Sequence, residues 1–148
     1  MPNFASNREA FHNYEILEKL EAGIQLTGPE VKSIKGGNVS LKGSFATIHN
    51  NELHLLNMHV GLYKPAAMIH QEPDRTRRLL VHRSDIDRFI GKIKSSGLSL
   101  VPLSIYSKSG LIKVELGLGR GKKAYDKRQS IKKRDVKRQI GRAMRVKG

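Results

Sequence analysis

The chain has 148 residues, no cysteine and a formal net charge of +15 at pH 7. This length suits one domain, and the absence of cysteine excludes disulfide bonds and thiolate metal sites. No apolar run approaches the 18 or so residues that span a bilayer, and the first ten residues lack the apolar segment of a signal peptide, so we expect a soluble, cytoplasmic protein without a membrane partner. The excess of positive charge points to a polyanionic partner, above all nucleic acid.

The first predicted elements are a short helix and a long strand. Asn7 stands where it can cap a helix that runs toward His12. Apolar and acidic residues then alternate from Tyr14 to Leu26, which predicts a strand, and Gly23 is expected to mark a bulge or bend in it.

A second short helix and a hairpin follow. Thr27 and Glu30 have the spacing of a capping box, so a helix should begin there and end at Gly36-Gly37. Residues 39–49 and 52–60 predict the two arms of a hairpin, because Asn50-Asn51 between them favours a turn.

The next segment is expected to be irregular before the main helix begins. Residues 63–76 contain two prolines and little periodicity, which predicts a mobile loop. A short buried strand or a turn should lie at residues 79–81. Ser84 is a good N-cap for a helix whose apolar residues recur at helical spacing, and Gly97 should close that helix.

The last two predicted strands decide the fold class. Residues 98–106 carry apolar side chains on both faces, as in a barrel wall, and residues 111–118 return after a turn at residues 108–110. Five or six strands with one main helix fit a small antiparallel barrel of the oligonucleotide-binding (OB) kind, because closure removes exposed edges. We therefore predict a mainly β protein with an OB-like barrel and short flanking helices over residues 1–118.

Residues 119–148 form a predicted basic tail. They hold 13 Lys and Arg against 2 Asp and Glu, whereas residues 1–118 hold 15 against 11. The apolar stripe in the tail is thin, so we expect it to be disordered when free and helical on its target. Tyr125 can stack on a base and Asp126 can accept a hydrogen bond, which favours RNA contact over a merely solubilising role.

No catalytic or metal site is predicted. None of the six histidines pairs at the i, i+4 spacing of a helical zinc site, and His54 and His59 should point to opposite faces of a strand. Asp85 and Asp87 fit the first turn of a helix, and the glycine-rich segments lack the order of a phosphate-binding loop. We expect no enzyme activity, no metal and no cofactor.

A series of short blocks runs in order from Asn7 nearly to the end of the chain. The blocks are Asn7–Ala10 with His12 and Tyr14, then Glu21–Gly23, Gly28–Ser33, Leu56–His59, Asp74–Leu80, Gly121–Lys123 and Asp126–Arg128. Together they resemble the SsrA-binding protein (small protein B, SmpB) family of bacteria.

The resemblance implies an OB-fold body that binds the tRNA-like domain of transfer-messenger RNA (tmRNA, SsrA) and delivers it to stalled ribosomes for trans-translation. In the family the body substitutes for the missing anticodon arm of tmRNA. The tail lies in the small-subunit decoding centre and the empty mRNA channel. The resemblance implies no DNA partner, and we expect a monomer when the protein is free.

The family's motifs also nominate contact residues. Carried over by position, the tmRNA-side candidates are Asn7, His12, Glu21, Leu80 and Lys113, and the ribosome-side candidates are Lys122, Lys123, Tyr125, Asp126, Lys127 and Arg128. His12 can stack on a base, Glu21 can accept from a guanine edge, and Lys113 can meet a phosphate. Leu80 is expected to support the core and Asn7 to cap a helix, so that both act indirectly.

Two departures from the family pattern affect the tail. Tyr125 stands where some relatives carry histidine, which keeps a stacking face and removes a pH-dependent charge. The extension past Arg145 is short, which predicts a shorter reach into the channel.

Two other classes of function remain as alternatives. A ribosomal protein or a general OB-fold RNA chaperone would bind RNA through charge and stacking with little selectivity. A small nuclease or RNA-modifying enzyme would need a cluster of histidines or carboxylates, which the sequence does not assemble.

Overall fold

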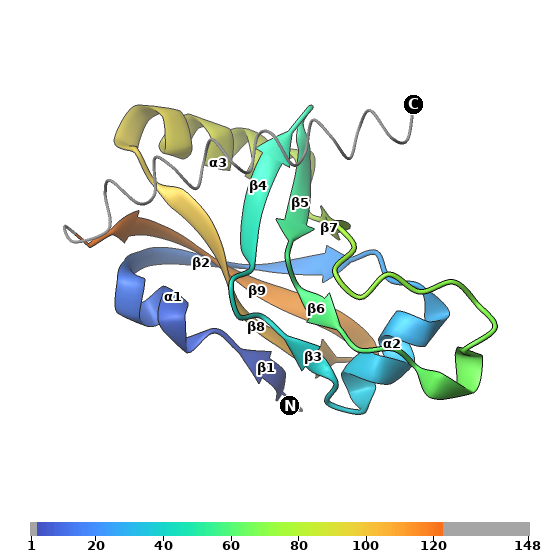
Figure 1. Ribbon diagram of the computed structural model, residues 1–148. Helices are drawn as coiled ribbons and strands as arrows, with labels where there is room; N and C mark the ends of the chain where they lie inside the picture. Colours follow the sequence, from blue (N-terminus) through green and yellow to red (C-terminus); the bar gives the residue numbers. More distant parts are fainter. Residues whose placement is uncertain (1–2, 123–148) are drawn as a thin grey trace.

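The structure is a computed structural model that describes residues 3–122 (Figure 1). Its helices are α1 (Arg8–Asn13), α2 (Gly28–Lys35) and α3 (Arg83–Ser96), with a 3-10 turn η1 (Lys64–Ala66). Its strands are β1 (Asn3–Ser6), β2 (Tyr14–Ile24), β3 (Val39–Ser40), β4 (Phe45–His49), β5 (Glu52–Leu56), β6 (His59–Val60), β7 (Arg77–Leu80), β8 (Ser99–Lys108) and β9 (Leu111–Gly121). No helix within residues 3–122 is long and apolar enough to cross a membrane.

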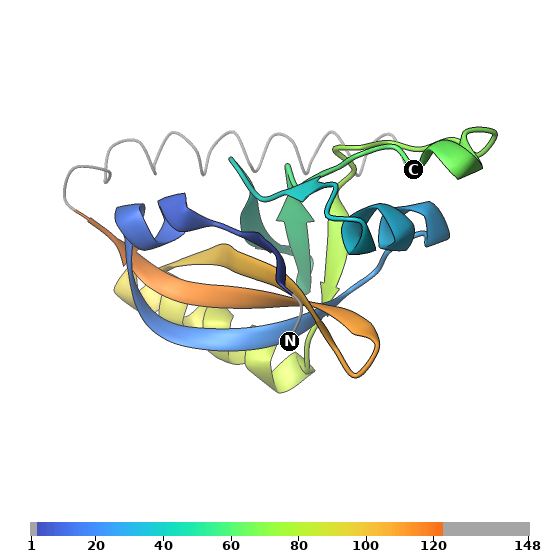
Figure 2. The same cartoon turned by 90° about the horizontal axis from the view of Figure 1, so that it is seen from below.

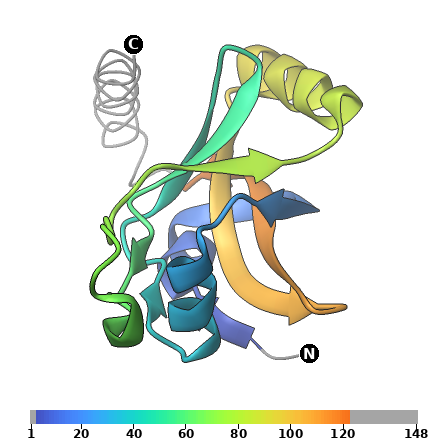
Figure 3. The same ribbon diagram turned by 90° about the vertical axis from the view of Figure 1, so that its right-hand side faces the viewer.

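The predicted mainly β, antiparallel architecture is confirmed. Seven strands form one sheet in the order β1-β8-β9-β2-β7-β5-β4, and β3 pairs with β6. The long strands β8 and β9, in orange, curve strongly and give the sheet a rounded, OB-like shape (Figure 3). Among the described residues β1 pairs only with β8 and β4 only with β5, so strand pairing does not show closure of the OB-like barrel that we expected.

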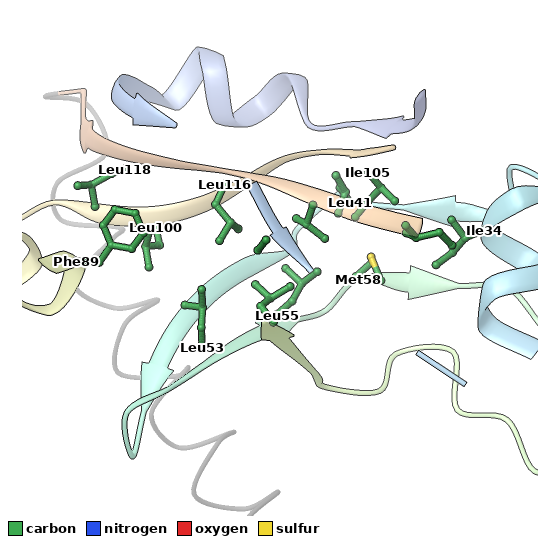
Figure 4. Close-up of a cluster of buried hydrophobic side chains, with 14 of the residues drawn as sticks. Ile34, Leu41, Leu53, Leu55, Met58, Phe89, Leu100, Ile105, Leu116 and Leu118 are labelled. Carbon is green, nitrogen blue, oxygen red and sulfur yellow. The ribbon is translucent and has the colours of Figure 1, made fainter. Parts of the chain in front are cut away.

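The main core lies on the concave side of the sheet (Figure 4). Ile34 of α2 and Phe89 of α3 point into it from opposite ends, and Leu55 and Leu116 meet them from β5 and β9. Each of these side chains is at most 1% exposed. Because complete burial of one such side chain contributes about 1.5–3 kcal/mol, this cluster holds the sheet in its curved shape.

The two apolar faces of β8 have different partners. Leu100 belongs to the main core, whereas Val101 and Leu103 pack with Ala10 of α1 in a smaller cluster on the other side. The register of β8 against β9 shifts between Pro102 and Ser104. This irregularity lets Leu103 face the smaller cluster while Ile105, two residues later, faces the main core. The predicted burial of both faces is therefore correct, but the cover on the second face is a helix.

The predicted helix ends at Thr27, Gly36 and Gly97 agree with the structure, whereas the one at Ser84 does not. The Thr27 hydroxyl accepts from the Glu30 N–H at 3.3 Å and the Glu30 carboxylate accepts from the Thr27 N–H at 2.8 Å, which confirms the capping box. Gly97 ends α3 with φ of 63°, as expected. The predicted cap at Ser84 is wrong, because α3 begins at Arg83 and its N-cap is His82, two residues before Ser84.

Several strand details differ from the predictions. The register shift in β2 lies between Ile16 and Glu18 rather than at Gly23. Asn50 and Asn51 both have positive φ and make the predicted turn, but each hairpin arm is broken once, near Gly43 and at Asn57. These last two residues also have positive φ, which a continuous strand does not allow. Strand β1 was not predicted, since four residues show too little alternation.

Strand β9 continues three residues past Leu118, where the sequence pattern had suggested that the body ends. Gly119 and Gly121 pair with Ile16 and Tyr14 of β2. A side-chain carbon at Gly119 would lie 2.9 Å from the Glu15 carbonyl oxygen, so glycine permits this close approach. The division of the chain into body and tail remains a prediction, but its boundary moves past Gly121.

A buried ion cluster joins α2 to β7. The side chain of Arg77 is 0% exposed, and its Nε donates to Glu30 Oε2 at 2.6 Å. Arg75 Nη2 donates to Glu30 Oε1 at 2.7 Å, and Arg77 Nη1 donates to the Met58 carbonyl oxygen at 2.7 Å. Three blocks of the family resemblance therefore meet at the side chain of Arg77, which their separation in the sequence could not reveal.

The expected loop at residues 63–76 is irregular, with the short turn η1 near its start. Gln71 accepts from the Tyr63 N–H at 2.8 Å and donates to the Ala66 carbonyl oxygen at 2.9 Å. These hydrogen bonds connect the two ends of the loop segment 63–71. The predicted mobility of the loop is not tested by them.

Candidate RNA interface

The strands β2, β9 and β8 present a polar surface on the side opposite the main core. Along β2, Leu20 and Ala22 face the core while Lys19 and Glu21 are exposed on the other side. We call this surface the outer face and define it by Lys19, Glu21, Leu80, Tyr106, Lys113 and Glu115, which the strand pairing brings together. In Figure 2, β2 and β9 run side by side, with α1 near one end and the β8–β9 turn at the other.

Glu21 is held by neighbours from β8. Its Oε2 accepts from the Tyr106 hydroxyl at 2.5 Å, and Lys108 Nζ lies 3.4 Å from both carboxylate oxygens. The hydrogen bond from Tyr106, followed by the charges of Lys108 and Lys113, lowers the pKa of Glu21. Glu21 is therefore a carboxylate at neutral pH, and it presents acceptor oxygens on an exposed sheet.

Leu80 and Lys113 flank Gly23 on the same surface. Gly23 pairs with Leu80 of β7 on one side and with Lys113 of β9 on the other. A side-chain carbon at Gly23 would lie only 3.3 Å from Leu80 Cβ, so glycine leaves room for Leu80 beside β2. Leu80 is 45% exposed while Leu79 is buried, and the prediction that Leu80 supports the core is therefore wrong.

Asn7 and His12 lie apart from this cluster. Asn7 is the N-cap residue of α1, as predicted, but its side chain is buried and makes no hydrogen bond to the helix, because its Nδ2 donates to the Pro102 carbonyl oxygen at 2.9 Å. The predicted cap by its side chain is thus wrong, and Asn7 instead anchors α1 to β8. His12 is exposed near the end of α1, beside the half-exposed ring of Phe11, over which Lys19 Nζ lies 5.7 Å from the centroid.

The first of the tail candidates is placed against α1. The Lys122 N–H donates to the Asn13 carbonyl oxygen at 3.0 Å, and Lys122 Nζ donates to the Phe11 carbonyl oxygen at 3.4 Å. The chain therefore leaves β9 next to the helix that carries His12. The other candidates lie outside the described residues: Lys123, Tyr125, Asp126, Lys127 and Arg128.

Sequence reasoning missed the partners of Glu21 on β8. A two-residue turn at Ser109-Gly110 pairs Lys108 with Leu111 and Tyr106 with Lys113, and that register could have been counted from the sequence. The register of β2 against β9 could not be counted in this way, because a long segment separates these strands.

The histidines form no metal site among residues 3–122, where no group of three or more His, Cys, Asp or Glu could hold an ion. His54 lies on β5 and is buried, while His59 lies on the separate strand β6 with Nδ1 3.0 Å from Asp74 Oδ1. The prediction that they share one strand is therefore wrong.

Comparisons with known proteins agree with this fold. A family model described as SmpB protein matches residues 4–146. An SsrA-binding protein of Carboxydothermus hydrogenoformans is 52% identical over 96% of this chain and 95% of its own length. An SsrA-binding protein of Bacillus cereus is 48% identical over 95% of this chain and 91% of its own.

A solved structure is similar over most of the chain as well. It is described as "tmRNA-SmpB: a journey to the center of the bacterial ribosome", with a TM-score of 0.66 and 48% identity. The match covers 88% of this chain and 92% of the other. With the family model spanning almost the whole sequence, the chain belongs to the SmpB protein family.

Proposed function

We propose that this chain binds tmRNA (SsrA) and acts with it on the ribosome in trans-translation. Its relatives at about half identity are SsrA-binding proteins, and its structural neighbour is an SmpB described with tmRNA in the bacterial ribosome. The protein would then work in the cytoplasm, where ribosomes are, as a monomer when free. Its role is to bind and deliver RNA, without catalysis of its own and without a cofactor.

The outer face is the proposed contact surface for the tRNA-like domain. The observation that supports it is the shared position of Glu21, Leu80 and Lys113 on neighbouring strands, all accessible from one side. Lys113 would meet a phosphate, Glu21 would accept from a base or a ribose hydroxyl, and Leu80 would give apolar contact to a base. A rigid sheet presents such groups in fixed relative positions, which a flexible chain does not.

Two further candidates act differently. His12 would extend the surface at α1 by stacking on a base. Asn7 would act through the placement of α1, since its side chain is buried against β8. Residues 123–148 would serve the ribosome side, in the decoding centre and the empty mRNA channel.

Replacing Glu21 by alanine is expected to weaken tmRNA binding by about 1.5–3 kcal/mol, the typical contribution of a hydrogen bond to a charged group. Titration of labelled tmRNA at fixed salt measures this change. The free energy of unfolding should stay within about 0.5 kcal/mol of wild type, because Glu21 is exposed. Glu72→Ala, which removes an exposed loop carboxylate, is the matched control and should bind normally. Normal binding by Glu21→Ala would remove Glu21 from the interface.

A further inference from the structure

The hydroxyl of Tyr106 and the carboxylate of Glu21 form the shortest polar contact across the outer face. Tyr106 donates to Glu21 Oε2 at 2.5 Å, whereas Lys108 reaches both oxygens only at 3.4 Å. Oε1 receives only this long contact from Lys108 among residues 3–122. The carboxylate thus has a short contact at one oxygen and only a long contact at the other.

The backbone of Tyr106 is held in the sheet. Tyr106 lies on β8 opposite Lys113 of β9, between the buried Ile105 and the half-buried Ser107. A tyrosine has only two side-chain torsions, so its hydroxyl is held at less entropic cost than the end of a lysine. Of the two donors to Glu21, Tyr106 is therefore the one that can define the direction of the carboxylate.

We propose that Tyr106 is a positioning residue for RNA recognition: its hydroxyl fixes Glu21 in one rotamer, so that Oε1 points outward to accept from tmRNA. This inference rests on the proposed function and deepens it. No role in RNA binding is required of the Tyr106 ring itself, and the effect of the hydroxyl passes through Glu21.

The electrostatic surroundings of Tyr106 keep its hydroxyl protonated, so that it can act as a donor. Burial, the hydrogen bond to Glu21 and the negative charges of Glu21 and Glu115 all raise the pKa of Tyr106. The hydroxyl therefore keeps its proton throughout the neutral range. The charged and titratable groups that face Glu21 are Tyr106 and Lys108 of β8, Lys113 and Glu115 of β9, and Lys19 on its own strand.

The test replaces Tyr106 by phenylalanine, which removes only the hydroxyl. In the free protein, the carboxyl carbon of Glu21 is followed by NMR against pH. Because the hydrogen bond from Tyr106 is the largest cause that lowers the pKa of Glu21, this pKa should rise in Tyr106→Phe. An unchanged pKa would overturn the proposal, whatever the RNA result.

The second measurement is tmRNA affinity at fixed salt in two backgrounds. Tyr106→Phe should bind about tenfold more weakly than wild type, but should change affinity less than about twofold when Glu21 is already alanine. Equal losses in both backgrounds would contradict action through Glu21. Tyr63→Phe is the control, since the Tyr63 hydroxyl has no hydrogen bond among the described residues, and it should bind as wild type.

The proposed function and the positioning role of Tyr106 can be disproved by different results. If wild-type protein bound tmRNA no better than bulk tRNA, the proposed function would fall, and with it the role of Tyr106 in recognition. If wild type selected tmRNA and Tyr106→Phe matched it in affinity, only the positioning role would be wrong.

Discussion

Replacing Arg77 by methionine is expected to lower the free energy of unfolding by about 3–5 kcal/mol. The substitution leaves the Glu30 carboxylate in a largely buried place with Arg75 as its remaining guanidinium partner. It also leaves the Met58 carbonyl oxygen without its donor from Arg77. Because small domains are stable by only about 5–15 kcal/mol, this loss is a large share of the total. Urea denaturation followed by circular dichroism measures it.

The neighbouring residue provides the control. Arg78 is half-exposed, and its Nε lies 3.6 Å from Glu52 Oε2, so Arg78→Met should change stability by less than about 1 kcal/mol. Arg77→Lys should fall between the two, because lysine keeps the charge but cannot reproduce the forked contacts. If Arg77→Met unfolded at the same urea concentration as Arg78→Met, the cluster would not be a major source of stability.

The same cluster gives stability a defined dependence on pH. Burial raises the pKa of Glu30, but the hydrogen bonds from Arg75 and Thr27 and the charge of Arg77 outweigh it, so the pKa is lowered. Since the folded-state pKa lies below the unfolded one, the contribution is complete above about pH 5 and is lost as pH falls through the folded-state pKa. Wild type should therefore lose more stability than Arg77→Met between pH 6 and the acid range.

A chain that ends at Lys122 is expected to keep its affinity for tmRNA and to lose transfer of the nascent chain to tmRNA. The end point follows from the structure, because residues 119–121 pair with β2 and the Lys122 N–H donates to Asn13. The removed segment is strongly basic, which suits a channel walled by ribosomal RNA phosphates. A message already threaded there would compete for the same space and charge. A reconstituted stalled ribosome measures binding and transfer separately.

Two further variants separate charge from pattern in the tail. Alanine at Asp126, Lys127 and Arg128 together should fail at the same step, after recruitment. A tail of identical composition in scrambled order should fail as well, because Tyr125 and its neighbours are then no longer at their positions in the chain.

At Tyr125, phenylalanine or histidine should support transfer of the nascent chain better than alanine, since a base needs a ring face. Normal transfer by the chain that ends at Lys122 would show that the tail is dispensable.

The sequence predicted local structure well where one segment decides it. The capping box at Thr27, the turn at Asn50-Asn51 and the end of α3 at Gly97 depend on neighbouring residues only, and all three are confirmed. Closure of the barrel could not be derived in this way, because it depends on pairing between strands that are far apart in the chain. Local patterns carry no information on such a pairing.

The candidate site also combines features that the sequence predicted with features that depend on the pairing of distant strands. The family resemblance nominated Glu21, Leu80 and Lys113, but their meeting around Gly23 follows from the register of three strands. The exposure of Leu80 opposed the sequence interpretation, because an alternating pattern does not say which face another element covers. The buried Arg77 had no local signal at all, since charged residues are usually exposed.

Competition between RNAs tests the central claim most directly. Labelled tmRNA bound to the full-length protein is challenged with an equal mass of bulk tRNA at physiological salt. A protein that recognises the tRNA-like domain of tmRNA through its outer face should keep the labelled RNA, and Glu21→Ala should release part of it. Complete displacement from the wild-type protein, equal to that by unlabelled tmRNA, would contradict specific recognition and would indicate a general RNA-binding protein instead.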